Sequence, residues 1–162
     1  MSEFTSYASG SRGNCYRVTD GRTPLLLECG ISINEILRKT NAMGGVSSLA
    51  GCLVSHGHKD HSKAVKDLMK FGVDIYLSQG TVAEISGMGP WRHRTNIIKA
   101  KQQFRLGTWT ILPFETQHDA VEPLGFLLAN KDGGKLLYAT DTYYIRYRFQ
   151  GLTHIAVECN YS

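Results

Sequence analysis

Short apolar runs of strand length are the feature of this 162-residue sequence that most restricts its fold. PLLLECG (24–30) and SLAGCLVS (48–55) are apolar without alternation, which is typical of strands buried on both faces. LGFLLANKDGGKLLYATDT (124–142) has the pattern of a hairpin with KDGG at its turn. Other strand-like runs are FTSYAS, CYRVTD, VDIYLS, LTHIAVEC and QFRLGTWTILPFET, the last forming one bent strand or two.

Helical segments lie between these runs. Ser32 and Glu35 form a capping-box pattern that predicts a helix over 33–40. SKAVKDLMKFG (62–72) has apolar residues at helical spacing and ends at a glycine, and TVAEIS (81–86) predicts a short helix. With no glycine-rich phosphate loop and no regular alternation, the sequence predicts a mixed-sheet α/β fold. We expect one domain over residues 1–162, without an internal linker.

The composition is that of a globular protein, with 42% hydrophobic residues and a net charge of +4. No apolar stretch is long enough to span a membrane, and the first residues lack the pattern of a signal peptide. The four cysteines are widely separated, so we expect reduced thiols and a cytoplasmic location rather than a disulfide framework.

The run SHGHKDHSK (55–63) follows an apolar strand and leads into a helix. His56 and His58 are two apart, so they point the same way from an extended chain and can hold one ion together. Asp60 and His61 lie at the turn into the helix and can face a second ion. Imidazole and carboxylate together are ligands for zinc, or for manganese or iron where carboxylates dominate. A histidine-rich polar loop without metal is the alternative.

A basic segment without acidic residues extends between Glu84 and Glu115. Its cations and aromatic residues suit a nucleic-acid backbone, because cations replace condensed counterions and rings stack on bases. We predict that Arg92, Arg94 and Lys99 contact the substrate. A solvated loop followed by a charged strand face is the alternative.

HGHKDH (56–61) resembles the HxHxDH motif of the metallo-β-lactamase superfamily, whose members are αββα sandwiches and metal-dependent hydrolases. ASGSRGNCYRV, LLLECG, YATDT and VECNY extend the resemblance to the YycJ/WalJ-type branch, which is linked to DNA exonuclease activity. The resemblance therefore implies two divalent metal ions, zinc first, and DNA as the substrate.

The resemblance also assigns site residues. Six residues would hold the two ions: His56, His58, Asp60, His61, His118 and Asp141. In this assignment His118 completes the first site, and Asp141 bridges the two ions. Asp60 would also hold the nucleophilic water, which makes it the catalytic residue. His93 and His154 are not expected to be ligands.

Two positions depart from the family pattern. Glu28 stands where the family usually has aspartate, and we expect it to steady the histidine loop without touching metal. The family also has a further histidine beyond the segment that here reads LTHIAVECNYS (152–162). The resemblance therefore implies a C-terminally truncated sandwich with a weaker second metal site. Apolar surface left uncovered would favour self-association.

Three functions agree with these patterns. The first is a metal-dependent phosphodiesterase that acts on nucleic acid, and the second is a hydrolase of a small ester, lactam or thioester, because one metal centre serves many substrates. The third is a metal-binding module without catalytic activity. Cleavage of DNA with and without a chelator separates the first from the other two.

Overall fold

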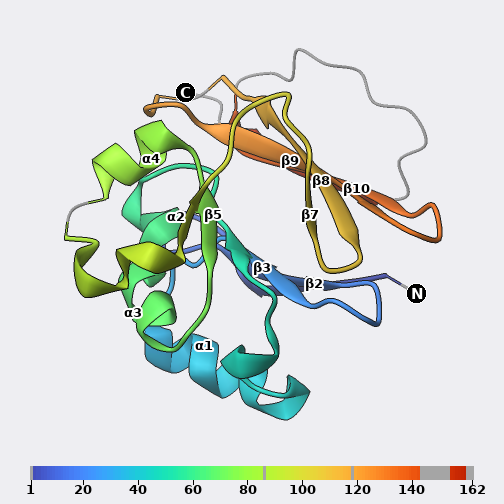
Figure 1. Cartoon of the computed structure of the whole chain (residues 1–162), viewed down its shortest axis with the longest axis horizontal. Helices are drawn as coiled ribbons and strands as arrows, with labels where there is room; N and C mark the ends of the chain where they lie inside the picture. The colour runs from blue at the N-terminus through green and yellow to red at the C-terminus, as the bar shows by residue number, and fades with distance from the viewer. Residues whose placement is uncertain (1, 86, 118, 143–153, 160–162) are drawn as a thin grey trace.

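The computed structural model describes residues 2–85, 87–117, 119–142 and 154–159, with the side chains of 140–142 and 154–159 outside the description. Two β-sheets pack face to face (Figure 1). Within the described residues, the strands of the first sheet are, in order, β1 (Glu3–Ala8), β2 (Cys15–Thr19), β3 (Leu25–Leu27), β4 (Cys52–Leu53), β5 (Ile75–Leu77) and β6 (Thr95–Ile97). The pairs β1–β2 and β2–β3 are antiparallel, whereas β3, β4, β5 and β6 run parallel.

The second sheet has the order β11-β10-β9-β8-β7. Its strands are β7 (Phe104–Leu106), β8 (Trp109–Glu115), β9 (Leu124–Asn130), β10 (Lys135–Thr142) and β11 (His154–Cys159). Neighbours are antiparallel except β10 and β11, which run parallel. The predicted hairpin is confirmed as β9 and β10, and the segment predicted as one or two strands forms two, β7 and β8, which turn at Gly107 (φ 59°).

The helices pack on the face of the first sheet that is turned away from the second sheet (Figure 1). They are α1 (Ile33–Thr40), α2 (Lys59–Ser62), α3 (Val65–Lys70) and α4 (Gln79–Glu84), with 3₁₀ turns η1 (Asn41–Met43), η2 (Val46–Ser48) and η3 (Gly89–Arg94). These helices and the two sheets supply the α, β and β layers of the predicted sandwich. Within the described ranges, no helix has the length and apolarity that crossing a bilayer requires.

The first sheet separates two apolar cores. Leu25, Leu26 and Leu27 of β3 are all completely buried, as the unbroken apolar run predicts. Leu26 packs in the core beneath the helices, whereas Leu25 and Leu27 pack in the core between the sheets, against residues such as Trp109 and Phe126. Successive side chains of a strand point to opposite faces, so β3 joins both cores and holds its carboxyl end rigidly.

The predicted start of the first helix is also confirmed. The Ser32 hydroxyl accepts a hydrogen bond from the Glu35 amide (3.2 Å), and α1 covers the predicted range. Helix α4 begins two residues earlier than predicted, because Ser78 caps it by accepting from the Thr81 amide (3.1 Å). The predicted strand over 48–55 is shorter, with only Cys52–Leu53 paired as a strand.

The prediction of one continuous helix over 62–72 is wrong. Helix α2 ends at Ser62 and α3 begins at Val65. The Ala64 amide donates to the Cys29 carbonyl (2.9 Å), and the Asp60 carbonyl, which a continuous helix would offer to Ala64, accepts from the Asn14 amide instead (2.8 Å). Tertiary hydrogen bonds therefore replace the helical ladder at this point.

Candidate metal centre

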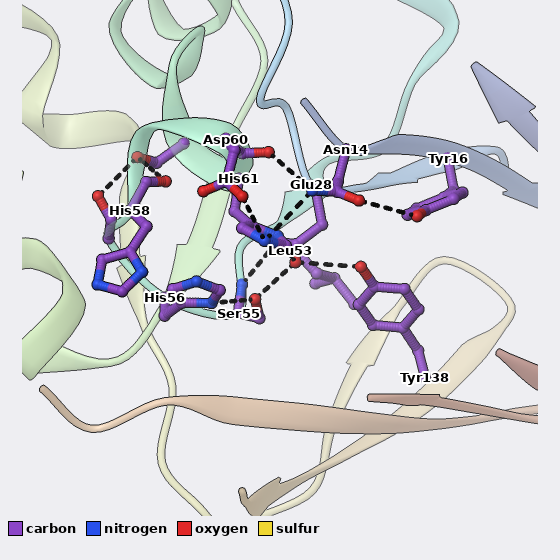
Figure 2. Close-up of polar contacts among 12 residues, drawn as sticks. Asn14, Tyr16, Glu28, Leu53, Ser55, His56, His58, Asp60, His61 and Tyr138 are labelled. Atoms are coloured by element: carbon purple, nitrogen blue, oxygen red, sulfur yellow. Dashed lines mark hydrogen bonds and ion pairs between the residues drawn. The ribbon is translucent and has the colours of Figure 1, made fainter. Parts of the chain in front are cut away.

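The centre lies at the carboxyl ends of β3 and β4. These strands are parallel neighbours, so the residues that follow them meet at one edge of the sheet. Glu28 follows β3, and the segment from Ser55 to His61 follows β4. Figure 2 shows these side chains converging from the two segments.

Backbone contacts fix the turn that carries Asp60 and His61. The Asn14 amide and its side-chain nitrogen both donate to the Asp60 carbonyl, at 2.8 and 3.2 Å, and the Cys29 amide donates to the His61 carbonyl at 2.9 Å. Gly30 lies so close that a Cβ atom added there would be 1.7 Å from the Asp60 carbonyl oxygen. Only glycine therefore permits this approach of the β3 end to α2.

The histidine run brings its ligand atoms together. One ligand atom each from His56, His58 and Asp60 lie within 4.8 Å of one another, and so do atoms of Glu28, His56 and His61. The His56 ring centroid is 4.8 Å from that of His58 and 4.2 Å from that of His61. Asp60 Oδ2 is 3.4 Å from His61 Nε2. His56 thus lies close both to His58, with which the sequence predicts it to share an ion, and to His61 of the other predicted pair.

The Glu28 carboxylate is the centre of the buried polar network. Its Oε1 accepts from the Ser55 amide (2.8 Å), and its Oε2 accepts from Ser55 Oγ (2.5 Å), His61 Nδ1 (2.6 Å) and Tyr138 Oη (3.1 Å) (Figure 2). Burial raises the pKa of Glu28, but the adjacent His61 and these hydrogen bonds lower it by more, so the net shift of this pKa is downward. Glu28 is therefore ionised at neutral pH and acts only as an acceptor.

Glu28 also has an unusual backbone conformation, with φ at 67°. A residue with a side chain in the left-handed region costs about 1–3 kcal/mol and persists only where its surroundings impose it. Here the conformation turns the chain out of β3 and directs the carboxylate toward Ser55 and His61. The strain is therefore located at the residue that organises the site.

The hydrogen bonds define the tautomers of two imidazoles. Ser55 Oγ uses its single proton on Glu28, so its contact with His56 Nδ1 (2.8 Å) requires that nitrogen to carry a proton. His61 Nδ1 faces the ionised Glu28 and must likewise be protonated. In the neutral rings, the lone pairs are then on Nε2. One buried carboxylate thus orients His61 directly and His56 through Ser55, a device typical of metal-binding histidines.

The structure does not describe the side chains of the two remaining predicted ligands. His118 lies outside the described residues. Asp141 belongs to β10, and its side chain is likewise outside the description.

The predicted substrate-binding residues occupy two segments. Arg92 and Arg94 belong to η3, and Lys99 follows β6. The Arg94 guanidinium donates to the Gly72 carbonyl (3.0 Å) and to Asp74 Oδ1 (3.3 Å), whereas Arg92 and Lys99 are exposed. Arg94 is therefore engaged in joining η3 to the segment before β5.

Three residues of the network were not predicted from the sequence: Asn14, Ser55 and Tyr138. Ser55 directly precedes the histidine run at the end of a buried strand, and this position could have indicated a buried hydroxyl partner. Asn14 lies in a turn-rich segment, and Tyr138 lies in a buried apolar run, where neither residue type is unusual.

Residues 23–157 match the family described as the β-lactamase superfamily domain. The chain belongs to this family. The resemblance to the metallo-β-lactamase superfamily and its YycJ/WalJ-type branch is thereby confirmed. The chain is 29% identical to exodeoxyribonuclease YycJ of Bacillus anthracis, over 92% of its own length and 58% of that protein. It is 28% identical to exodeoxyribonuclease WalJ of Streptococcus pneumoniae strain D39, over 95% and 59% of the two lengths.

Solved structures show the same fold for this β-lactamase superfamily domain. The metallo-β-lactamase fold protein YhfI of Bacillus subtilis has a TM-score of 0.67 at 17% identity, covering 90% of this chain and 64% of that one. MEM-A1, a subclass B3 metallo-β-lactamase from a soil metagenome, has a TM-score of 0.66 at 14% identity, covering 86% and 60%. The chain thus spans about three fifths of the length of the relatives that it resembles.

Proposed function

We propose that this chain carries the centre of a metal-dependent phosphodiesterase that cleaves DNA. The observation that carries the proposal is the cluster of His56, His58 and Asp60, whose ligand atoms lie within 4.8 Å of one another. The relatives named as exodeoxyribonucleases, at 28–29% identity, support DNA as the substrate.

The donor set fits divalent metal ions. Imidazole nitrogens and a carboxylate oxygen suit zinc first, with manganese or iron as alternatives. In the proposed arrangement, His56 and His58 hold one ion together with His118, whereas Asp60 and His61 hold a second that Asp141 shares. The Nδ1–H tautomers support this arrangement, because they place the lone pairs of His56 and His61 on Nε2, the ring nitrogen that contacts neither Ser55 nor Glu28. In His61 the Asn14 side-chain nitrogen lies 3.3 Å from Nε2, so an ion there would replace this contact.

We do not assign Glu28 as a ligand, although its carboxylate also lies within 4.8 Å of ligand atoms of His56 and His61. Its Oε2 atom already accepts three hydrogen bonds, and its Oε1 accepts the Ser55 amide. Direct coordination through Oε2 would require hydrogen bonds to break inside a buried network, and Oε1 is directed at the Ser55 amide. We propose that Glu28 orients the imidazoles and stays out of the coordination sphere.

The chemistry divides between the ions and the protein. When bound, the ions supply Lewis acidity that lowers the pKa of a water molecule to about 7 and neutralises charge on the phosphate. Asp60, whose side chain is about one-third exposed, is positioned to orient that water and accept its proton. Glu28 and Ser55 keep His56 and His61 in place, so that little reorganisation is needed when the substrate arrives.

DNA cleavage with matched variants tests the proposal. The protein is assayed on a fluorescent DNA strand with zinc or manganese, with a chelator, and with the metal restored. Asp60→Asn should lower the rate by about 10²–10⁴-fold, which is the usual contribution of a general base. Asp132→Asn makes the same chemical change at an exposed position in the turn between β9 and β10 and should leave the rate unchanged.

Three results would contradict the proposal. Cleavage that survives exhaustive chelation would exclude a metal-dependent reaction. Metal binding and DNA binding without cleavage would identify an inactive metal-binding module. Hydrolysis of small esters, lactams or thioesters without cleavage of DNA would identify a small-molecule hydrolase.

A further inference from the structure

A basic pocket lies directly beside the histidine loop, on the helix side of the first sheet. Its volume is about 350 Å³, and its lining includes Gly57, Lys59, Ser62, Lys63, Lys66 and Glu84. None of the three lysines belongs to the basic segment that the sequence indicates as a substrate contact. They come from α2, from α3 and from the break between these helices.

The pocket has a net positive charge. Three ammonium groups and one carboxylate line it, which gives a net charge of +2. The carboxylate is already engaged, because Glu84 Oε1 accepts a hydrogen bond from the Val121 amide (2.7 Å). The three lysines are exposed and line the same pocket, although they belong to two helices and the break between them.

The pocket adjoins the loop that carries the proposed metal ligands. Gly57 lines it and lies between His56 and His58 in the chain, and Lys59 adjoins His58 and Asp60. A phosphate in the pocket would therefore be held next to the residues that we propose as metal ligands.

On its other side the pocket approaches the basic segment. The Lys66 ammonium lies 3.4 Å from where a Cβ atom would stand on Gly87, two residues before η3 begins. Helix α3 also contacts η3, which carries Arg92 and Arg94. Cations thus extend from the histidine loop across α2 and α3 toward η3.

We propose that this pocket is a phosphate subsite that holds the backbone of a nucleic-acid strand beside the scissile phosphate, with Lys63 and Lys66 as the principal contacts. The inference rests on the proposed function and assigns residues to its substrate. A small neutral ester gains no affinity from a second cationic subsite. A polyanionic strand, in contrast, gains affinity from each cation that replaces condensed counterions.

Binding of a fluorescent single-stranded oligonucleotide, measured by anisotropy over a salt series with chelator present, tests the subsite. Loss of two phosphate contacts in Lys63→Gln/Lys66→Gln should reduce the slope of log K against log salt by about 1.4, or about 0.7 per contact. If the variant and the wild type bind equally at 1 M salt, the variant should therefore bind about 25-fold more weakly than the wild type at 0.1 M salt. Arg22→Gln/Lys131→Gln removes the same charge from two exposed turn positions and should leave the slope unchanged.

A second substrate separates this inference from the proposed function. A small activated phosphodiester reaches only the metal centre, so the lysine variant should hydrolyse it at the wild-type rate while its DNA cleavage falls. A wild-type protein that neither binds nor cleaves DNA would overturn the proposed function itself. Wild-type cleavage combined with equal DNA binding by the two double variants would overturn the subsite alone.

Discussion

Replacing Glu28 with glutamine tests how the candidate centre is held together. The substitution preserves the shape of the side chain and exchanges one acceptor oxygen for an NH₂ donor. Oε2 accepts three hydrogen bonds and Oε1 accepts one, so the amide oxygen should occupy the Oε2 position. The NH₂ group then faces the Ser55 amide, and two donors oppose each other in a fully buried position.

The magnitude follows from these contacts. A buried donor without an acceptor costs about 1–3 kcal/mol. The bond from His61 also loses its ionised acceptor, and hydrogen bonds to charged groups contribute about 1.5–3 kcal/mol against about 1 kcal/mol for neutral ones. We therefore expect Glu28→Gln to lower the free energy of unfolding by about 2–4 kcal/mol. Metal affinity should fall about 10–100-fold, because the imidazoles lose their orienting carboxylate.

Two measurements on the same protein check this. Urea unfolding gives the stability, and competition with a chromophoric chelator gives the zinc dissociation constant. Asp20→Asn is the matched control, because Asp20 is also a buried carboxylate that accepts backbone hydrogen bonds, from Arg22 and Thr23 at 3.0 and 2.8 Å. The control should lose stability and keep its zinc affinity. Unchanged zinc affinity in folded Glu28→Gln protein would refute the proposed orienting role.

Three further predictions concern the surroundings of the site. Gly30→Ala should lower the unfolding free energy, measured by urea unfolding, by more than about 3 kcal/mol. The reason is that the added Cβ would overlap the Asp60 carbonyl. Ser55→Ala should weaken zinc binding in the chelator competition, since the proton on His56 Nδ1 loses its acceptor, whereas Ser55→Thr should retain most of the affinity. The pKa of Asp20 is lowered: burial raises it, but the hydrogen bonds that the carboxylate accepts lower it by more. Its ionised form therefore stabilises the protein above the unfolded pKa of about 3.9, and the stability difference between wild type and Asp20→Asn should shrink as the pH falls below about 4.

Local patterns predicted those parts of the fold that local interactions determine. The Ser32 cap, the apolar run of β3 and the hairpin of β9 and β10 each depend on residues close together in the chain, and each is confirmed. The position of the histidine run at one edge of the sheet was also predictable. A buried strand that leads into a helix places the residues between them at the carboxyl end of that strand.

The missed features depend on contacts between distant segments. Asn14 reaches the Asp60 carbonyl across 46 positions of sequence, and Tyr138 reaches Glu28 across 110. No local pattern reports such pairs, so the interruption between α2 and α3 and the network around the carboxylate could not be derived from the sequence. The lysine pocket was missed for the same reason, since it requires α2, α3 and α4 to be placed in space.

The interruption between α2 and α3 has a consequence for folding. The segment Lys59–Ser62 is a single turn, far too short to be a stable helix by itself. Its native hydrogen bonds come from Asn14 and Cys29, so we expect the ligand geometry to form only with the assembled sheet. The amides of Asn14, Cys29 and Ala64 should then exchange with solvent only through global unfolding.

Because the unfolded chain has no preformed ligand geometry, we expect the proposed metal to bind almost exclusively to the native state. A bound ion would then stabilise the whole fold, by about 2.7 kcal/mol at a concentration one hundred times its dissociation constant. The unfolding temperature of this chain should consequently rise with the free metal concentration, so that the thermal stability of the protein reports how much metal is available to it.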